Sequence, residues 1–306
     1  MSKNVLLLIC LLAFSALAAQ AAPTTQEEAA VCVSGKPAKE TIAGCTKILS
    51  LPTLDSQAHV GALLVRGDAY SLLGDLDIAA ADYESAQKIS YSPNVSVVLG
   101  QIYVNLGKSN QAIAEFTKIV DAGLATAQIF NLRGGAFQNA GDFDASIADF
   151  NKALLLKPDF LMAINNRAAA YAKKGDLKAA LKDIDAVLAA DPNMPMALAN
   201  RCGLLAKDGN LELGRQSCDK AERLASDNYF ILLAIGGAYY DASRFAEAVD
   251  YFSRSIRLMP QNPRALYMRG MAEAKLGKAE DSNADIMAAA QIQPDIAVFM
   301  TKSGLK

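Results

Sequence analysis

One period of about 34 residues runs through most of this 306-residue chain and constrains its fold more than any other feature. The segment "RGGAFQNAGDFDASIADFNKALLLKP" begins at Arg133, and "RAAAYAKKGDLKAALKDIDAVLAADP" begins at Arg167 in the same register. Small residues mark this register, spaced 33 residues apart once and then 34 residues apart five times: Gly67, Gly100, Gly134, Ala168, Cys202, Gly236 and Gly270. Such a period indicates a solenoid in which each unit buries its apolar surface against its neighbours.

Each unit contains two apolar segments with helical spacing, separated by a short polar pair such as Gly74-Asp75, Gly141-Asp142 or Gly175-Asp176. Glycine provides the positive φ that ends a helix, and aspartate can cap the helix that follows. A proline then stops the second helix in four units: Pro158, Pro192, Pro260 and Pro294. The pattern predicts seven helical hairpins, over residues 60–92, 93–126, 127–160, 161–194, 195–228, 229–262 and 263–296.

Aromatic residues recur at positions 11 and 24 of the units. Position 11 holds Tyr70, Tyr103, Phe137, Tyr171 and Tyr239, and position 24 holds Tyr83, Phe116, Phe150 and Phe252. Together with the small residues at position 8 and the prolines at position 32, this pattern resembles the tetratricopeptide repeat family. The departures are Leu205 and Glu273 at position 11 and Ile184, Cys218 and Ile286 at position 24. The resemblance covers most of the chain and implies an all-α superhelix of stacked hairpins with a concave groove.

The beginning of the chain has the features of a secretory signal peptide over residues 1–21. Lys3 lies in a short basic region, an apolar run extends from Val5 to Leu17, and Ala19-Gln20-Ala21 supplies a small-x-small cleavage pattern. The run is too short for a membrane span of ~20 residues. Cys10 suggests a lipoprotein alternative, but it lies inside the apolar run. We therefore expect a mature chain without a membrane span, in the periplasm of a Gram-negative bacterium or secreted.

The two ends of the repeat array differ from its middle. Residues 22–59 are expected to form a degenerate helical hairpin, because "ETIAGCTKILSLP" matches a second helix. The first helix of this hairpin is expected around Glu27 to Ser34. Residues 297–306 are too few for a full capping helix and are expected to form a short C-terminal cap.

Four cysteines remain after the expected leader, and an even number in an exported protein favours disulfides over free thiols. Cys202 and Cys218 occupy positions 8 and 24 of the fifth unit, where the other units place a small residue opposite a large one. We expect a Cys202–Cys218 disulfide there. Cys32–Cys45 is expected to staple the first hairpin in the same way.

Positions 7 and 23 vary together between the repeats. Four units combine arginine with aspartate: Arg66–Asp82, Arg133–Asp149, Arg167–Asp183 and Arg269–Asp285. Where the arginine is missing the acid also changes, since Leu99 accompanies Glu115 and Ile235 accompanies Tyr251. The pattern predicts structural ion pairs between the two helices of a hairpin, with a ligand site as the secondary interpretation.

Catalytic and metal chemistry find little support in the sequence. His59 is the only histidine, which excludes most Ser-His-Asp and multi-histidine sites, and there is no Cys-x-x-Cys motif. The net charge of -2 does not favour nucleic acid as a partner. The repeats occupy nearly the whole chain and leave no room for a catalytic domain. We therefore expect a non-enzymatic protein without a metal or cofactor.

The family resemblance also implies which residues line the groove, through positions 2, 5, 9, 12 and 13 of each first helix. Amides are expected in the early groove, at Asn94, Gln101, Asn105, Gln128, Asn131, Gln138, Asn139 and Asn165. Apolar and aromatic residues are expected in the later groove, at Met196, Phe230, Leu233, Tyr240, Tyr267 and Met271. The amides could pair with the backbone of an extended peptide, and the aromatic half could hold apolar anchors. The alternative is that the polar residues only solvate the surface.

These features together favour a scaffold that binds a protein or peptide partner in its groove. The second interpretation is an assembly or regulatory subunit of an envelope enzyme or secretion complex. The basic clamp that some family members use for a C-terminal carboxylate is not matched, because positions 5 and 9 lack the required Lys and Asn.

Overall fold

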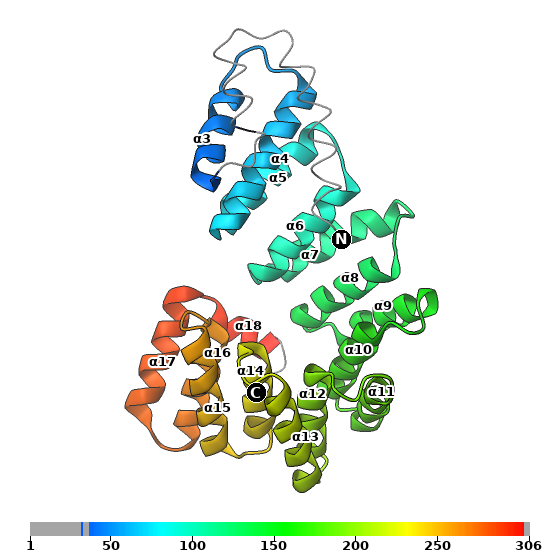
Figure 1. Cartoon of the computed structure of the whole chain (residues 1–306), viewed down its shortest axis with the longest axis vertical. Coiled ribbons are helices and arrows are strands. Elements are labelled where there is room, and N and C mark those ends of the chain that lie inside the picture. The colour runs from blue at the N-terminus through cyan, green and yellow to red at the C-terminus, as the bar shows by residue number, and fades with distance from the viewer. Residues whose placement is uncertain (1–31, 33–36, 303–306) are drawn as a thin grey trace. The chain divides into compact units, whose positions relative to one another are not determined.

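The computed structural model describes Cys32 and residues 37–302, and over these residues every regular element is an α-helix. The expected leader and most of the expected first helix lie outside the described residues. The chain divides into two compact units, residues 1–125 and 126–306 (Figure 1). The first unit contains α3 (Ala38–Leu49), α4 (Ser56–Leu73), α5 (Leu76–Ile89), α6 (Pro93–Asn105) and α7 (Ser109–Asp121).

The second unit continues the hairpins and ends in a short helix. It contains α8 (Ala127–Ala140), α9 (Phe143–Leu156), α10 (Leu161–Lys174), α11 (Leu177–Ala190), α12 (Pro195–Lys207), α13 (Leu211–Leu224), α14 (Tyr229–Asp241), α15 (Phe245–Leu258), α16 (Pro263–Lys275), α17 (Ala279–Ile292) and α18 (Ile296–Lys302). The prediction of an all-α fold is confirmed. No described helix is both long and apolar enough to cross a bilayer.

The turns inside the hairpins follow the glycine-aspartate chemistry of the sequence. Gly141 ends α8 with a φ of 85°, a conformation that L side chains rarely adopt. Asp142 then begins α9, and its Oδ1 accepts a 3.0 Å hydrogen bond from the backbone N–H of Ala145. Each glycine-aspartate pair thus ends one helix and starts its partner within two residues.

A glycine facing an aromatic ring lets the two helices of a hairpin approach closely. Phe150 is fully buried, and a Cβ atom added to Gly134 would lie 2.8 Å from its ring. Gly100 and Phe116 show the same relationship, with a Cβ at 2.5 Å. Since real Cβ contacts are longer, the ring occupies the space that a side chain at position 8 would need.

The fifth hairpin replaces the glycine and the ring by a covalent link. Cys202 of α12 and Cys218 of α13 form a disulfide, and Cys32 and Cys45 form another in the first unit. A Cβ on Gly214 would lie 3.0 Å from the carbonyl oxygen of Cys202, so the absence of a side chain there allows the bridged helices their close contact. The two cysteines of this hairpin are 3% and 0% exposed and form part of the apolar core.

The second unit closes on itself through its last helix. Helix α18 contacts α16 and α17, which precede it, and also α8, the first helix of the unit (Figure 1). Ile296 and Met300 anchor α18 in the core and are each 2% exposed. Within the unit, α12 and α14 also pack directly together. The absence of a side chain at Gly203 allows this close contact, since a Cβ there would lie 3.3 Å from the Cβ of Ala238.

Candidate functional site

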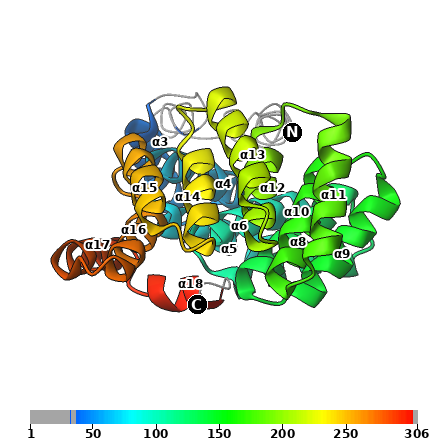
Figure 2. The ribbon, with the colours of Figure 1, turned by 90° about the horizontal axis from the view of Figure 1, so that it is seen from below.

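The second unit contains a cavity of about 240 Å³, which we call the channel. Residues of α8, α10, α12, α14, α16 and α18 line it. The first four of these helices follow one another across the unit (Figure 2). All but α18 are first helices of their hairpins. The channel is therefore built from equivalent faces of successive repeats.

Small residues at position 9 of three successive repeats keep the channel open. Ala169, Gly203 and Gly237 all line it. A Cβ on Gly237 would meet no atom within 4 Å, so the space beside this glycine is empty. A larger side chain at Gly237 would therefore project into the channel.

Charged residues at position 13 of three successive repeats line the channel. Lys173, Lys207 and Asp241 line it from the ends of α10, α12 and α14, and Arg264 joins them from the start of α16. Lys207 Nζ lies 2.8 Å from Asp241 Oδ2, which forms an ion pair. Three cations and one anion leave the channel with a net charge of +2 among its described lining residues.

Two of these cations, Lys173 and Arg264, are not held by a hydrogen bond or ion pair in the described part of the chain. Both side chains are exposed to solvent, although the protein packed around them partly desolvates their charged groups. This burial lowers the pKa of Arg264. Burial also lowers the pKa of Lys173, and repulsion from Lys207 and Arg264 adds to the effect while Asp241 opposes it.

The remaining lining combines amides with flexible apolar side chains. Gln138 of α8 and Asn200 of α12 provide the amides, and Met268 and Met300 provide the apolar wall. Asn200 Nδ2 donates a 3.0 Å hydrogen bond to Asn165 Oδ1, which holds its amide in place. Such a lining suits binding: polar groups orient a ligand, and methionine adapts to its shape.

Models of one repeat family account for most of the chain. Tetratricopeptide repeat models match residues 60–92, 97–159, 165–229 and 233–295. The chain belongs to the tetratricopeptide repeat family. This confirms the relationship expected from the repeat pattern. A comparison with curated proteins finds no match.

Solved tetratricopeptide repeat structures share the fold at low sequence identity. A tetratricopeptide repeat protein from Parabacteroides merdae is 16% identical with a TM-score of 0.59, covering 80% of this chain and 98% of its own. Yeast Tom70 is 14% identical with a TM-score of 0.57, covering 92% of this chain and 63% of its own. A thermophilic protein of the family from Thermus thermophilus is 18% identical with a TM-score of 0.51, covering 58% of this chain and 97% of its own. At these identities the likeness concerns the fold alone.

Few of the expected groove residues of this tetratricopeptide repeat protein line the channel. Gln138 is the one that does. Asn131 and Asn165 are each 4% exposed, and each accepts a hydrogen bond from the following repeat, from Asn166 at 3.1 Å and Asn200 at 3.0 Å respectively. These amides form a ladder between repeats rather than a free ligand surface.

The other expected residues lie in several environments. Leu233 and Tyr240 are each 7% exposed and belong to the core, where the Tyr240 ring packs edge-on against Phe245. Phe230 is 54% exposed and contacts Tyr229. Asn94, Gln101 and Asn105 belong to the first unit. Gln128 is exposed, and the half-buried remainder are Asn139, Met196, Tyr267 and Met271.

The charged channel residues were missed by the sequence interpretation, although a signal for them exists. Lys173, Lys207 and Asp241 are spaced at 34 residues and stand at one position of three consecutive repeats. Reading that position down the repeats would have found the charges. Their convergence with Arg264 depends on how tightly the repeats curl, which the spacing does not reveal.

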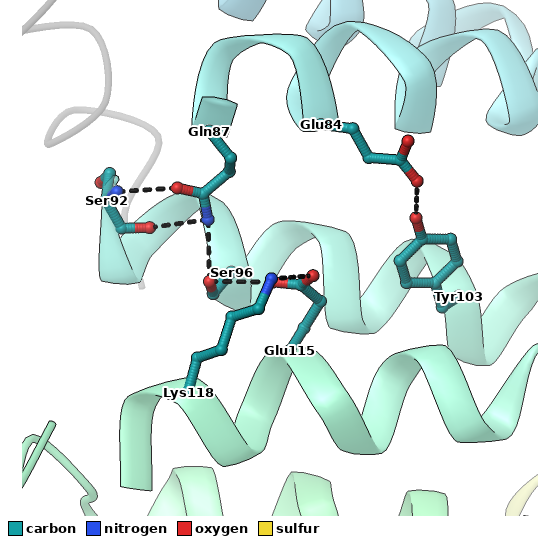
Figure 3. Close-up of polar contacts among 7 residues, drawn as sticks. All are labelled: Glu84, Gln87, Ser92, Ser96, Tyr103, Glu115 and Lys118. Carbon is teal, nitrogen blue, oxygen red and sulfur yellow. Dashed lines mark hydrogen bonds and ion pairs between the residues drawn. The ribbon is translucent and has the colours of Figure 1, made fainter. Parts of the chain in front are cut away.

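The first unit holds a second cavity, of about 400 Å³, beside a buried polar network (Figure 3). Glu115 occupies the place of the usual aspartate and is 8% exposed. Its Oε2 accepts a 3.0 Å hydrogen bond from Ser96 Oγ, and its Oε1 lies 2.6 Å from Lys118 Nζ. Gln87 Nε2 in turn donates to Ser96 Oγ at 2.8 Å.

This network connects α5, α6 and α7 and has a structural role. Leu99 stands where other repeats have arginine, so Glu115 obtains its partners from Ser96 and Lys118 instead. The Tyr103 hydroxyl donates to Glu84 across the neighbouring repeats (Figure 3). Its polar groups satisfy one another, whereas Lys173 and Arg264 in the channel make no hydrogen bond or ion pair with a described residue. The channel is therefore the stronger candidate site.

Proposed function

We propose that this tetratricopeptide repeat protein is a non-enzymatic scaffold that binds a protein or peptide partner in the channel of its second unit. The family fold commonly mediates protein–protein interaction. The observation that carries the proposal is the row of small residues at position 9, which leaves open space between charged and amide side chains. An extended chain segment can enter such a space and pair its backbone with the amides.

The proposal includes a location outside the cytosol, in the periplasm. Two features support it: the signal-like residues 1–21 and the disulfides Cys32–Cys45 and Cys202–Cys218. Disulfides persist in oxidising compartments such as the periplasm and are rare in the cytosol. Separating the compartments of the native cell and detecting the chain in each fraction tests this part.

The channel can be filled without disturbing the fold. Gly237→Leu would extend a side chain into empty space and would replace glycine inside a helix, which favours folding by about 0.5–1 kcal/mol. Gly135→Leu is the matched control, because Gly135 stands at position 9 of an earlier repeat, also has no atom within 4 Å of an added Cβ, and does not line the channel.

The purified chain is panned against a displayed library of random peptides, and the enriched peptides are measured against both variants. We expect Gly237→Leu to abolish binding and Gly135→Leu to retain it, with both melting at or above the temperature of the parent protein. Enriched peptides that bind both variants equally would place the site elsewhere. A library with no enriched peptide would contradict peptide binding altogether.

A further inference from the structure

The channel has a chemical preference that goes beyond the capacity to hold a peptide. We propose that it takes the carboxylate of an aspartate or glutamate side chain from an extended partner peptide, held between Lys173 and Arg264. This inference rests on the proposed function, since it names the chemistry that the same site recognises.

The arrangement of charges is the first argument. The only anion among the described lining residues, Asp241, already pairs with Lys207. Lys173 and Arg264 line the same space, and neither makes an ion pair with a described residue, so the one carboxylate of the lining is outnumbered by three cations. Two like charges in one partly desolvated space repel each other, and an incoming anion removes that repulsion. Desolvation lowers the pKa of both groups, and for Lys173 repulsion from Lys207 and Arg264 adds to it against the attraction of Asp241.

The size of the space is the second argument. A volume of about 240 Å³ is below the range of ~300–1,000 Å³ that is usual for pockets holding whole small-molecule ligands. It suits one or two side chains of a peptide. A carboxylate on a short methylene stem matches the lining, because Met268 and Met300 can contact the stem while the cations bind the oxygens. A free inorganic anion would make no use of the apolar wall.

The stacking of the repeats brings the residues of this site together, and no short sequence motif contains them. The two free cations come from α10 and α16, which are separated by two complete hairpins. The basic clamp for a C-terminal carboxylate uses other positions and is not matched in this sequence. The ligand expected here is an internal acidic residue, so a peptide with both ends blocked should bind.

Two pools of fluorescent nonapeptides test the inference. One pool has glutamate at its centre and the other has glutamine, and the flanking residues are random but exclude Asp, Glu and Cys. Both pools carry acetylated and amidated ends, so the central side chain is the only carboxylate. Anisotropy is measured with the purified chain, with Lys173→Gln and with Arg264→Gln. Lys275→Gln is the matched control, because Lys275 stands at the same position 13 but does not line the channel.

We expect the glutamate pool to bind about tenfold more tightly than the glutamine pool, with the difference shrinking at high salt. Lys173→Gln and Arg264→Gln should each weaken the glutamate pool by about five- to tenfold and leave the glutamine pool unchanged. Lys275→Gln should behave as the parent protein. Because Lys173 and Arg264 make no hydrogen bond or ion pair with a described residue, neither substitution should lower the melting temperature.

The measurements separate a wrong carboxylate preference from a wrong proposed function. Equal binding of both pools, lost in Gly237→Leu, would leave the peptide scaffold standing and overturn the carboxylate preference. No binding of either pool would contradict the proposed function itself. If inorganic phosphate binds the channel while the glutamate pool shows no advantage, the channel is a site for free anions and the peptide inference is wrong.

Discussion

Arg133 of α8 and Asp149 of α9 face each other across one hairpin and form a bidentate ion pair. Arg133 Nε donates to Asp149 Oδ2 at 2.6 Å, and Nη2 donates to Oδ1 at 2.9 Å. The two side chains are 10% and 3% exposed, which makes this the most buried of the four Arg–Asp pairs. A geometry of this kind fixes both the distance and the rotation between the two helices.

Breaking this pair should be costly, because removing the carboxylate leaves the buried Arg133 guanidinium without its bidentate partner. We expect Asp149→Ala to lower the free energy of unfolding by about 3 kcal/mol, measured by urea denaturation. Asp144→Ala is the control, since the Lys174–Asp144 pair lies at the surface and should leave stability unchanged. Peptide binding by Asp149→Ala below its melting temperature should persist. Unchanged stability with lost binding would instead make the pair a ligand site.

Replacing either of two adjacent glycines of α8 by alanine should change the stability of the protein, but in opposite directions. A Cβ at Gly134 would lie 2.8 Å from the buried Phe150 ring, and we expect Gly134→Ala to destabilise the protein by about 1–3 kcal/mol through overpacking. Gly135 has open space around it, so Gly135→Ala should stabilise by about 0.5–1 kcal/mol through helix propensity. Thermal unfolding followed by circular dichroism measures both. Equal effects would show that the ring does not pack on Gly134.

The Cys202–Cys218 disulfide closes a short loop and should stabilise the fifth hairpin. Its sequence separation of 16 corresponds to about 3 kcal/mol in the chain-entropy model, so Cys202→Ala should lower stability by roughly that amount. Adding Cys218→Ile to Cys202→Ala reproduces the Ala168 and Ile184 arrangement of the preceding repeat and should recover part of the loss. Mass spectrometry without reduction provides the direct check. Free thiols at all four cysteines would contradict both bridges.

The network around Glu115 should depend on one buried hydroxyl. Ser96 is fully buried and connects Gln87 to Glu115, so Ser96→Ala removes the hydroxyl donor to the Glu115 Oε2 atom, while the Gln87 amide keeps its hydrogen bonds to the Ser92 backbone. We expect a loss of about 1–3 kcal/mol in the free energy of unfolding. Ser85→Ala is the control, because the Ser85 hydroxyl is exposed and donates only to the carbonyl of Ala81 in its own helix. A comparable loss in both variants would argue against the network.

The sequence by itself determined the relationships inside a single hairpin. The period, the Gly141-Asp142 turn and the pairing of Arg133 with Asp149 all lie within one repeat, and each recurs often enough to be recognised by comparing repeats. Contacts sixteen residues apart across a tight turn depend on local helix geometry, which the residue pattern specifies. The family and the all-α fold could be predicted for this reason.

Only the tertiary structure decided which residues face the channel. Asn165 is buried in a ladder to Asn200, while Lys173 and Arg264 converge from helices 91 residues apart in sequence. The curl of the second unit, with α12 packed on α14 through Gly203 and α18 returning to α8, brings these cations together. That curl sums small rotations between successive repeats, and a single repeat's sequence does not specify the sum.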